Sequence, residues 1–353
     1  MPEFLYPGRS AVTEQTGNAL VWQLRGGRRL TLAPFLVAGI LNITPDSFSD
    51  GGLYAAPGAI LKRAGEHLAA GAGMLDLGAE STRPGAEDIG HAEEWRRLEP
   101  ALRDCLDLRC RSLPEPAALE GDGMKAPALP FALSVDSFRA ETAKKALELT
   151  PGEDALALAR TRGIAQPPLL DVINDVSGGS FDPAMPEILA QYKPGYVLGH
   201  SPDRPAVMQE KARYDNVVDT LLHWFASRME LLVGCGLPEA CICLDPCIGF
   251  GKSPEHALEI IAAIPRLLTL GRPLYFGVSR KSLLGAFTGQ APRDRDGATQ
   301  VLTALLAGAG VAVHRVHDTR GAVAALQITG ALRARVSFGG TARHLFATEE
   351  ELS

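Results

Sequence analysis

The segment FLVAGILN (35–42) is a short, almost wholly apolar run that ends in an asparagine. A run of this kind, bounded by turn residues, is typical of a strand buried on both faces of a sheet. Seven later segments follow the same pattern, namely MLDLG (74–78), FALSVD (131–136), LLDVIND (169–175), GYVLGH (195–200), CICLD (241–245), PLYFGVS (273–279) and VAVHRVH (311–317). We therefore expect eight parallel strands.

Longer stretches of helical character separate these strands, since parallel strands need crossover connections. They lie at about 58–70, 91–108, 139–149, 182–192, 215–234, 254–269, 297–308 and 319–334. Eight strand and helix pairs predict an α/β fold, most economically a single (β/α)8 TIM barrel. A doubly wound open sheet is the alternative.

The 353 residues exceed a common barrel by about 100, and the surplus can be placed. We expect an N-terminal extension at 1–34, the barrel at 35–340 and a C-terminal tail at 341–353. Within the extension, VWQLRGGRRLTL (21–32) alternates around two glycines and predicts a β-hairpin that plugs the bottom of the barrel.

Two further segments, at about 109–130 and 150–168, break the regular repeat. The first is rich in proline and glycine and predicts an irregular loop, and the second could hold a short helix between proline-rich ends. Both fall between a helix and the next strand, which is the bottom face of a barrel. We therefore expect both insertions to leave the active site intact.

Composition narrows the functional classes. The chain is 46% apolar and 22% charged, which excludes a disordered or fibrous protein. The net charge of −6 without a basic block argues against nucleic-acid binding. The sequence lacks a membrane-length apolar run and an N-terminal signal pattern, so we expect a cytoplasmic protein with reduced cysteines.

Nearly every predicted strand ends in a polar residue, and in a parallel barrel these ends converge on one mouth. The set consists of Asn42, Asp76, Asp136, Asn174 with Asp175, His200, Asp245, Ser279 with Lys281, and Arg315 with His317. Four carboxylates, two amides, a lysine and an Arg/His pair predict an active site rather than a solvated rim.

The residues around these strand ends carry a family resemblance. GILNITPDSFSDGG (39–52) and GAGMLDLGAESTRPGAE (71–87) resemble the two signatures of dihydropteroate synthases. The family's later motifs follow in order, as SVDSFRAETAKKAL, INDVSGG, LDPCIGFGKSPEH, GVSRKSLLG and RVHDT, so the resemblance covers roughly 20–335. It implies condensation of 6-hydroxymethyl-7,8-dihydropterin diphosphate with para-aminobenzoate to 7,8-dihydropteroate and pyrophosphate, a step of folate biosynthesis blocked by sulfonamides.

The resemblance also implies roles for single residues. Asp136, Asn174, Asp245 and Lys281 would bind the pterin, whose donor edge suits a carboxylate and whose acceptor edge suits a lysine. Asn42, Thr82, Arg83, Arg315 and His317 would bind the diphosphate, with Asn42 also contacting Mg²⁺. Phe48, Pro84 and Ser282 would bind para-aminobenzoate, and the catalytic set would be Lys281, Arg315, His317 and Asp136.

Two loops, TPDSFSDGG (44–52) and ESTRPGA (80–86), would cover the second substrate as mobile lids. Because the amine of para-aminobenzoate is itself the nucleophile, we expect no covalent enzyme intermediate. The family's habit of pairing through late helices implies a homodimer.

Some positions depart from the family pattern. Cys247 and Ile248 stand where glycine and an aromatic residue are usual, and Gly199 and Ser201 replace methionines on either side of His200. We expect a remodelled pocket floor and less apolar cover over the pterin.

Three other interpretations remain. A pterin-dependent methyltransferase shares the barrel but needs neither the ESTRPG loop nor an Arg/His clamp. A degenerate paralogue that only binds pterin or stabilises a partner would not need the intact charged ring.

A metal site is suggested by the cluster of Cys235, Cys241, Cys243 and Cys247, but the spacing of these cysteines matches no paired C-x2-C motif. Cys241 and Cys243 are simpler to explain as apolar residues on one face of a strand.

Overall fold

The computed structural model describes residues 20–32, 34–43, 58–81, 88–114, 129–164, 166, 168–210 and 212–335. Within them, eight parallel strands form one sheet in the order β8-β7-β6-β5-β4-β3-β10-β9. These strands are β3 (Leu36–Asn42), β4 (Met74–Gly78), β5 (Ala132–Asp136), β6 (Val172–Asp175), β7 (Gly195–Gly199), β8 (Ile242–Asp245), β9 (Tyr275–Phe276) and β10 (Val313–Val316). A parallel bridge from Leu244 to Leu274 joins the two ends of this order and closes the barrel.

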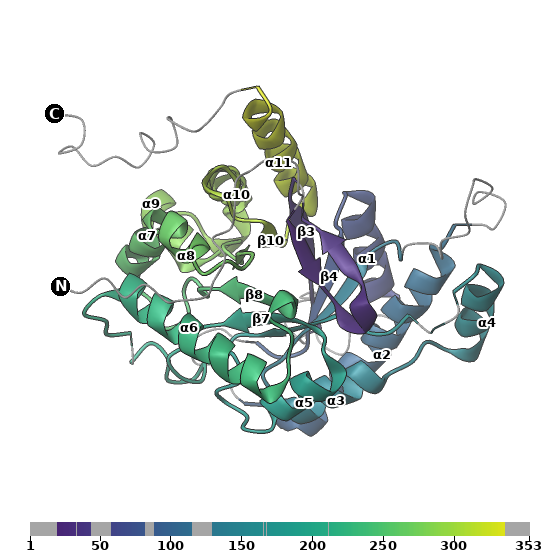
Figure 1. Cartoon of the computed structure of the whole chain (residues 1–353). Coiled ribbons are helices and arrows are strands. Elements are labelled where there is room, and N and C mark those ends of the chain that lie inside the picture. Colours follow the sequence, from purple (N-terminus) through teal and green to yellow (C-terminus); the bar gives the residue numbers. More distant parts are fainter. Residues whose placement is uncertain are drawn as a thin grey trace.

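Helices cover the outside of this barrel (Figure 1). They are α1 (Ala59–Ala69), α2 (Gly90–Arg111), α3 (Ala140–Glu148), α4 (Glu153–Thr161), α5 (Met185–Tyr192), α6 (Val217–Cys235), α7 (Pro254–Ala262), α8 (Ile264–Leu268), α9 (Ser282–Thr288), α10 (Asp296–Ala309) and α11 (Thr319–Arg333). The (β/α)8 prediction is confirmed, and the doubly wound alternative is wrong because strands adjacent in sequence pair all the way round.

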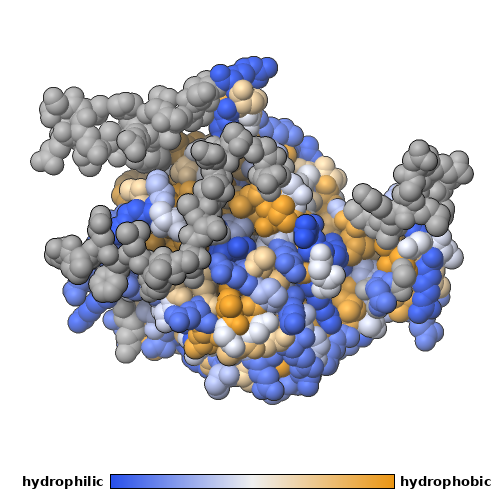
Figure 2. Space-filling view, in the orientation of Figure 1, coloured by the Kyte–Doolittle hydropathy of each residue, from blue (hydrophilic) through white to orange (hydrophobic). Residues whose placement is uncertain are grey.

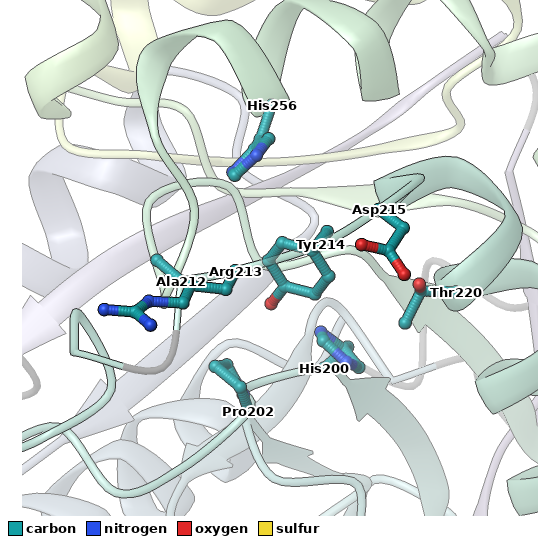
Figure 3. Close-up of a pocket in the computed structure, with 8 residues that line it drawn as sticks. All are labelled: His200, Pro202, Ala212, Arg213, Tyr214, Asp215, Thr220 and His256. Carbon is teal, nitrogen blue, oxygen red and sulfur yellow. The ribbon is translucent and has the colours of Figure 1, made fainter.

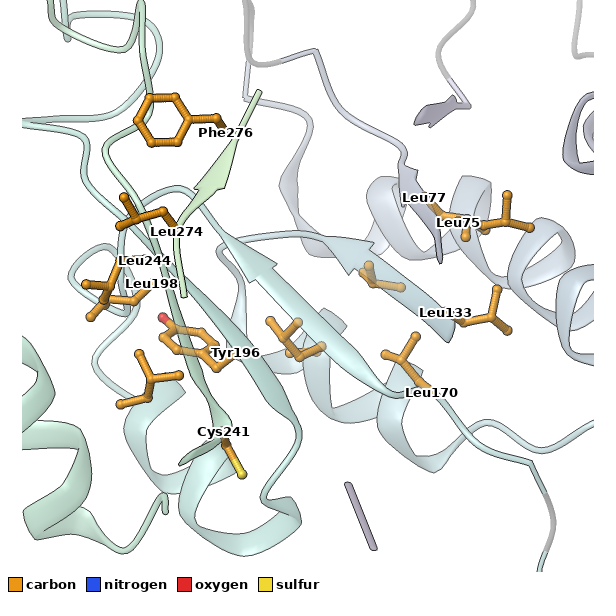
Figure 4. Close-up of a cluster of buried hydrophobic side chains, with 14 of the residues drawn as sticks. Leu75, Leu77, Leu133, Leu170, Tyr196, Leu198, Cys241, Leu244, Leu274 and Phe276 are labelled. Carbon is orange, nitrogen blue, oxygen red and sulfur yellow. The ribbon is translucent and has the colours of Figure 1, made fainter. Parts of the chain in front are cut away.

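Each strand alternates between two apolar layers. Side chains on the outer face pack against the helices, and they include Leu75, Leu133, Leu198 and Leu244 (Figure 4). The residues between them on the inner face form a second core near the start of the strands. Hydrophilic residues are frequent on the helical surface visible in Figure 2, with apolar patches between them, as amphipathic helices require.

The predicted hairpin is present and closes the bottom of the barrel. It pairs β1 (Val21–Gln23) with β2 (Arg29–Thr31) around a turn in which Gly26 has a φ of 68°. Trp22 is fully buried within the inner core, and its indole N–H donates to the Cys241 carbonyl at 2.7 Å. Arg28 adds an ion pair with Asp171, directly before β6.

The described parts of the two predicted insertions pack against each other. Cys110 and Leu113, at the end of α2, share a small apolar cluster with Ala155 and Ala159 of α4. The short helix expected within 150–168 is therefore present, as α4. Arg109 of α2 reaches Asp171 at 2.5 Å, which fixes this region at the strand starts, opposite the strand ends. Residues 115–128 of the first insertion lie outside the described residues, as do 1–19 and the tail.

The structure differs from the expected elements in two places. The strand expected at 273–279 is reduced to the two residues of β9, and α9 follows it where no helix was predicted. The helix signal in the sequence is SLLGAFT (282–288) followed by Gly289, which ends the helix at a φ of 67°. In the described residues no helix is long and apolar enough to cross a membrane.

We predict that Trp22→Ala lowers the free energy of unfolding by about 3–5 kcal/mol, because it empties a filled position at the barrel bottom and removes a buried hydrogen bond. Urea denaturation followed by circular dichroism measures the change. Val21→Ala, on the same strand but 40% exposed, is the matched control and should cost less than about 1 kcal/mol. Equal effects of the two substitutions would show that the hairpin does not plug the barrel.

Candidate active site

Along each strand, every second side chain faces the barrel axis. This alternation continues from the inner apolar core to a layer of polar side chains at the strand ends. Met74, Val172 and Cys243 belong to that core, so Asp76, Asn174 and Asp245, each two residues further on, also face the barrel axis. The same alternation brings the remaining members of this layer to the inner face, namely Asn42, Ser134, Asp136 and Arg315. Six of the polar strand ends predicted from the sequence thus lie around one mouth.

Arg315 joins two carboxylates inside this layer. Its Nε donates to Asp76 Oδ2 at 2.5 Å and its Nη2 donates to Asp136 Oδ2 at 2.7 Å. The Asn174 amide donates to the same Asp76 oxygen at 3.1 Å. Strands β4, β5, β6 and β10 are therefore connected through a single hydrogen-bonded cluster.

This cluster is not fully satisfied from within the described chain. Asp76 Oδ1, Ser134 Oγ and Tyr275 Oη are buried side-chain atoms without a hydrogen-bond partner, and all three residues lie on the inner faces of barrel strands. Buried polar atoms in folded proteins are nearly always bonded to protein, ordered water or a ligand. These atoms mark the inner face at the strand ends as a place where a ligand with several donor groups could be bound.

The shared guanidinium does not neutralise both carboxylates. Burial raises the pKa of the Asp136 carboxyl to about 7, with the Asp76 carboxylate adding to the shift and Arg315 opposing it. The Asp136 carboxyl can therefore hold a proton near neutral pH. A site of this kind can accept hydrogen bonds and can also exchange a proton.

Asp245 and Lys281 form a second charged group beside the first. Asp245 Oδ1 accepts the Cys247 N–H at 2.7 Å, and burial raises the pKa of this carboxyl while Lys281 opposes the rise. Lys281 Nζ donates to the Ile248 carbonyl and lies 4.5 Å from the centre of the Phe250 ring. Burial lowers the pKa of the Lys281 ammonium, with Asp245 opposing the change.

His317 and Ser282 lie further out along the rim. His317 Nδ1 is 2.9 Å from Ser279 Oγ, and burial lowers the pKa of this imidazole to about 3, with Arg280 and Arg315 contributing. The ring is therefore neutral and can act on an anion through an N–H group rather than through charge. Ser282 is the first residue of α9.

Two residues expected in the ring point away from it. Asp175 bonds to Ser177, Gly179 and Tyr196 on the outer side of the sheet, and the His200 ring packs edge-on against Trp224 of α6 at 4.8 Å. Both corrections follow from the alternation, because each residue is one position beyond an inward-facing one.

His200 instead lines a separate cavity outside the barrel wall, of about 690 Å³. Tyr214 lies between His200 and His256 in this cavity (Figure 3). Its lining is completed by Pro202, Ala212, Arg213, Asp215 and Thr220.

The two departures from the family pattern at positions 199 and 247 are linked, because the two residues lie against each other. Cys247 has a φ of 50°, in the left-handed region that favours glycine. A Cβ atom on Gly199 would lie 2.9 Å from Cys247 Sγ and 2.6 Å from the Asp175 carbonyl oxygen. The absent side chain at 199 thus leaves room for the Cys247 thiol, which packs with Phe138 and Val176 in an apolar cluster.

The cysteines do not gather into one group. Cys243 belongs to the inner core, whereas Cys241 lies in a 3-10 turn before β8 and packs with the outer core, so the two do not share a strand face as expected. Burial raises the pKa of the Cys241 thiol to about 11. Within the described ranges, no set of three or more His, Cys, Asp or Glu is arranged to hold a metal ion.

One buried cation received no role in the sequence analysis. Lys252, in the loop after β8, is 4% exposed and donates to the carbonyls of His200 and Phe250, each at 2.9 Å. Its only sequence signal was its place in the motif GFGK (249–252). Phe48, Thr82, Arg83 and Pro84, with most of the two predicted lids, lie outside the described residues.

A closed (β/α)8 barrel with charged side chains at the C-terminal mouth has the architecture of a barrel enzyme. The sequence pattern of the pterin binding enzyme family matches residues 38–112 and 124–317. The break between the two matched ranges falls inside the first predicted insertion, whereas the second insertion lies within the match.

The relatives are more specific. The dihydropteroate synthase of Streptococcus pyogenes is 31% identical over 286 residues, covering 80% of this chain and 90% of that protein. That of Mycobacterium leprae is 33% identical over 312 residues, covering 86% and 95%. The chain therefore belongs to the pterin binding enzyme family and, within it, to the dihydropteroate synthases, which are transferases.

Solved structures agree with this assignment. Dihydropteroate synthase from Yersinia pestis, in complex with a sulfonamide drug, has a TM-score of 0.71 and 29% identity, over 88% of this chain and 98% of that one. The enzyme from Thermus thermophilus, in complex with 4-aminobenzoate, has a TM-score of 0.68 and 32% identity, over 88% and 99%.

We predict that Asp136→Asn changes how stability depends on pH. The folded pKa of about 7 exceeds the unfolded value, so between about pH 4 and 7 the folded carboxyl keeps a proton that the unfolded one releases. The contribution of this carboxyl to the free energy of unfolding is therefore present at low pH and is lost as pH rises toward 7.

The difference in unfolding free energy between wild type and Asp136→Asn should accordingly fall as pH rises from about 5 to 8, as measured by urea denaturation at several pH values. Asp154→Asn, on the exposed side of α4, is the control and should show a constant difference from wild type. A constant difference for Asp136→Asn as well would mean that the Asp136 carboxyl has an ordinary pKa.

Proposed function

We propose that the polar layer at the strand ends binds 6-hydroxymethyl-7,8-dihydropterin diphosphate and condenses it with para-aminobenzoate, giving 7,8-dihydropteroate and pyrophosphate. The observation that carries the proposal is the group of acceptors on the inner face, namely the buried Asp76 and Asp245 and the half-buried Asp136, beside the Lys281 ammonium. A reduced pterin presents amino and ring N–H donors on one edge and acceptors on another, which matches this distribution. Folate biosynthesis is the pathway that uses this product.

In the proposed pterin complex, Asp245 accepts the amino and ring N–H groups and Asn174 and Asp136 complete that edge. Lys281 donates to the carbonyl side of the ring. The unpartnered Asp76 Oδ1 offers one further acceptor. Asp76, Asn174 and Asp245 are buried, and the low local polarity strengthens their hydrogen bonds to the ligand.

The leaving diphosphate accumulates negative charge as the carbon–oxygen bond breaks, so it needs positive charge and N–H donors at the mouth. Arg315 would supply the charge, together with Arg83, and His317 and Thr82 would supply hydrogen-bond donors. Because Arg315 already donates to Asp76 and Asp136, only its remaining N–H groups can bind phosphate. Protonation of Asp136 would weaken its bond to Arg315 and release a further N–H group for the phosphate.

A Mg²⁺ ion would fit at Asn42. An amide oxygen at the end of β3 is a suitable hard donor, and Mg²⁺ commonly takes its other ligands from substrate phosphates and water. When bound, the ion supplies further positive charge to the diphosphate.

The second substrate would enter above the pterin. Its amine attacks the methylene carbon as the carbon–oxygen bond to the diphosphate breaks, and the amine then loses a proton. Phe48 and Pro84 would flank its ring, and Ser282 would receive its carboxylate at the start of α9. The proposal assigns no side chain as nucleophile.

The direct test is a turnover assay. We expect purified protein to release pyrophosphate from the dihydropterin diphosphate in the presence of Mg²⁺, and only when para-aminobenzoate is added. Release that does not depend on the amine, or no release, contradicts the proposal. Absence of release with pterin binding intact would favour the degenerate paralogue instead.

We predict that Lys281→Met lowers kcat/KM at least about 100-fold, because it removes a half-buried cation proposed to face the substrate and leaves Asp245 without its main counter-charge. Steady-state kinetics with both substrates measures the loss. The matched control is Lys145→Met, which removes an exposed ammonium paired with Glu141 on α3 and should leave turnover unchanged. Wild-type kinetics in Lys281→Met would remove Lys281 from the site.

We also propose that the chain forms a homodimer through α10 and α11. These helices pack against each other and expose apolar residues one turn apart, with Val301 64% exposed and Leu305 39% on α10, and Ile328 64% and Leu332 51% on α11. An exposed apolar surface of this kind is typical of a protein interface.

We expect sedimentation to show a dimer that Ile328→Glu dissociates, because an unpaired carboxylate would be buried at the interface. Leu258→Glu, at a 47% exposed position on α7, is the control and should remain dimeric. A wild-type monomer, or an Ile328→Glu dimer of unchanged affinity, would exclude this interface.

A further inference from the structure

The ammonium of Lys252 ties together the loops after two neighbouring barrel strands. Nζ donates to the carbonyl of His200, which follows β7, and to the carbonyl of Phe250, in the loop after β8. Both partners are neutral, although the side chain is almost wholly buried. Taking an ammonium out of water is unfavourable, so a counter-charge nearby helps to retain it.

Burial lowers the pKa of Lys252 to about 8, with Cys247 and then the Asp245 carboxylate opposing the shift and Lys281 adding to it. The Asp245 carboxylate therefore contributes to that counter-charge. Burial raises the pKa of the Asp245 carboxyl, and cations from three parts of the chain oppose the rise, namely Lys281 after β9, Lys252 after β8 and Arg315 on β10. Lys281 and Arg315 would both be drawn to substrate, whereas both hydrogen bonds of Lys252 to the described residues go to backbone carbonyls.

Lys252 also reaches the site through the backbone. The His200 N–H donates to the Asp245 carbonyl at 3.1 Å, and the His200 carbonyl in turn accepts Lys252. On the other side, Lys252 holds the Phe250 carbonyl, and the Phe250 ring lies 4.5 Å from Lys281 Nζ. One ammonium therefore supports both members of the Asp245–Lys281 pair.

We propose that Lys252 is a positioning residue for pterin binding, which fixes the loops after β7 and β8 and so the placement of Asp245 and of the Phe250 ring beside Lys281. This proposal rests on the function proposed above. It assigns Lys252 no contact with the pterin.

Lys252→Gln tests the role of the charge, because glutamine retains an N–H donor for a carbonyl but is neutral. We expect the KM for the dihydropterin diphosphate to rise about tenfold, with the KM for para-aminobenzoate within about twofold of wild type. Without the ammonium the pKa of Asp245 rises, so the acid limb of the pH profile of kcat/KM should move up by about 0.5–1 pH unit.

Lys252→Arg keeps the charge and should restore both the KM and the acid limb. Lys145→Gln, on the surface of α3, is the control and should match wild type in both. Unchanged KM and pH profile in Lys252→Gln would overturn the proposal. So would an equal loss of kcat and melting temperature in the Gln and Arg variants without a pH shift, since that is the result of a merely structural role.

If Lys252→Gln does not fold, Lys252→Arg decides the question through its acid limb, which must coincide with that of wild type. A wild-type protein that releases no pyrophosphate contradicts the proposed reaction instead. Pterin binding, followed by quenching of pterin fluorescence across the same pH range and the same variants, then still tests Lys252, and affinities that do not differ between Lys252→Gln and wild type would overturn its role.

Discussion

The guanidinium of Arg315 holds the carboxylates of Asp76 and Asp136 together at the level where the apolar filling of the barrel ends. Two buried carboxylates could not stay so close without a cation, and a buried cation could not stay without them. This cluster fixes the ends of strands from opposite parts of the sequence. Asn174, with a bond to Asp76, and the neighbouring Asp245–Lys281 pair complete a polar floor above an apolar plug.

The hairpin at the other end makes this arrangement possible. Trp22 and Leu24 belong to the apolar core that fills the barrel axis from below. The polar layer at the strand ends therefore lies on a filled apolar base. Unpartnered acceptors above such a base suit a flat heterocycle that must be desolvated before it reacts.

Much of this could be predicted from the sequence because strand alternation is a local rule. Asp136, Asn174, Asp245 and Arg315 were placed correctly at the mouth. The same rule, applied residue by residue, would have turned Asp175 and His200 outward. Helix α9 was missed because a seven-residue apolar segment after a strand could equally be a longer strand. The ion pairs could not be predicted, since they depend on which inward side chains reach each other.

Contacts between distant residues also explain the departures from the family pattern. Gly199 and Cys247 are far apart in the sequence, but the Cys247 thiol occupies space that a side chain at position 199 would need. The sequence alone indicates no role for Lys252, because a lysine in a loop is usually solvated. Its burial, and its bonds to two carbonyls, set it apart.

The central claim is that the inner polar layer at the strand ends binds the pterin. A crystal structure of this chain with 6-hydroxymethylpterin monophosphate tests it most directly. We predict the pterin ring within hydrogen-bond distance of Asp245, Asn174 and Lys281. A pterin bound elsewhere, such as in the outer cavity beside Tyr214, with the inner carboxylates unchanged, would contradict the account.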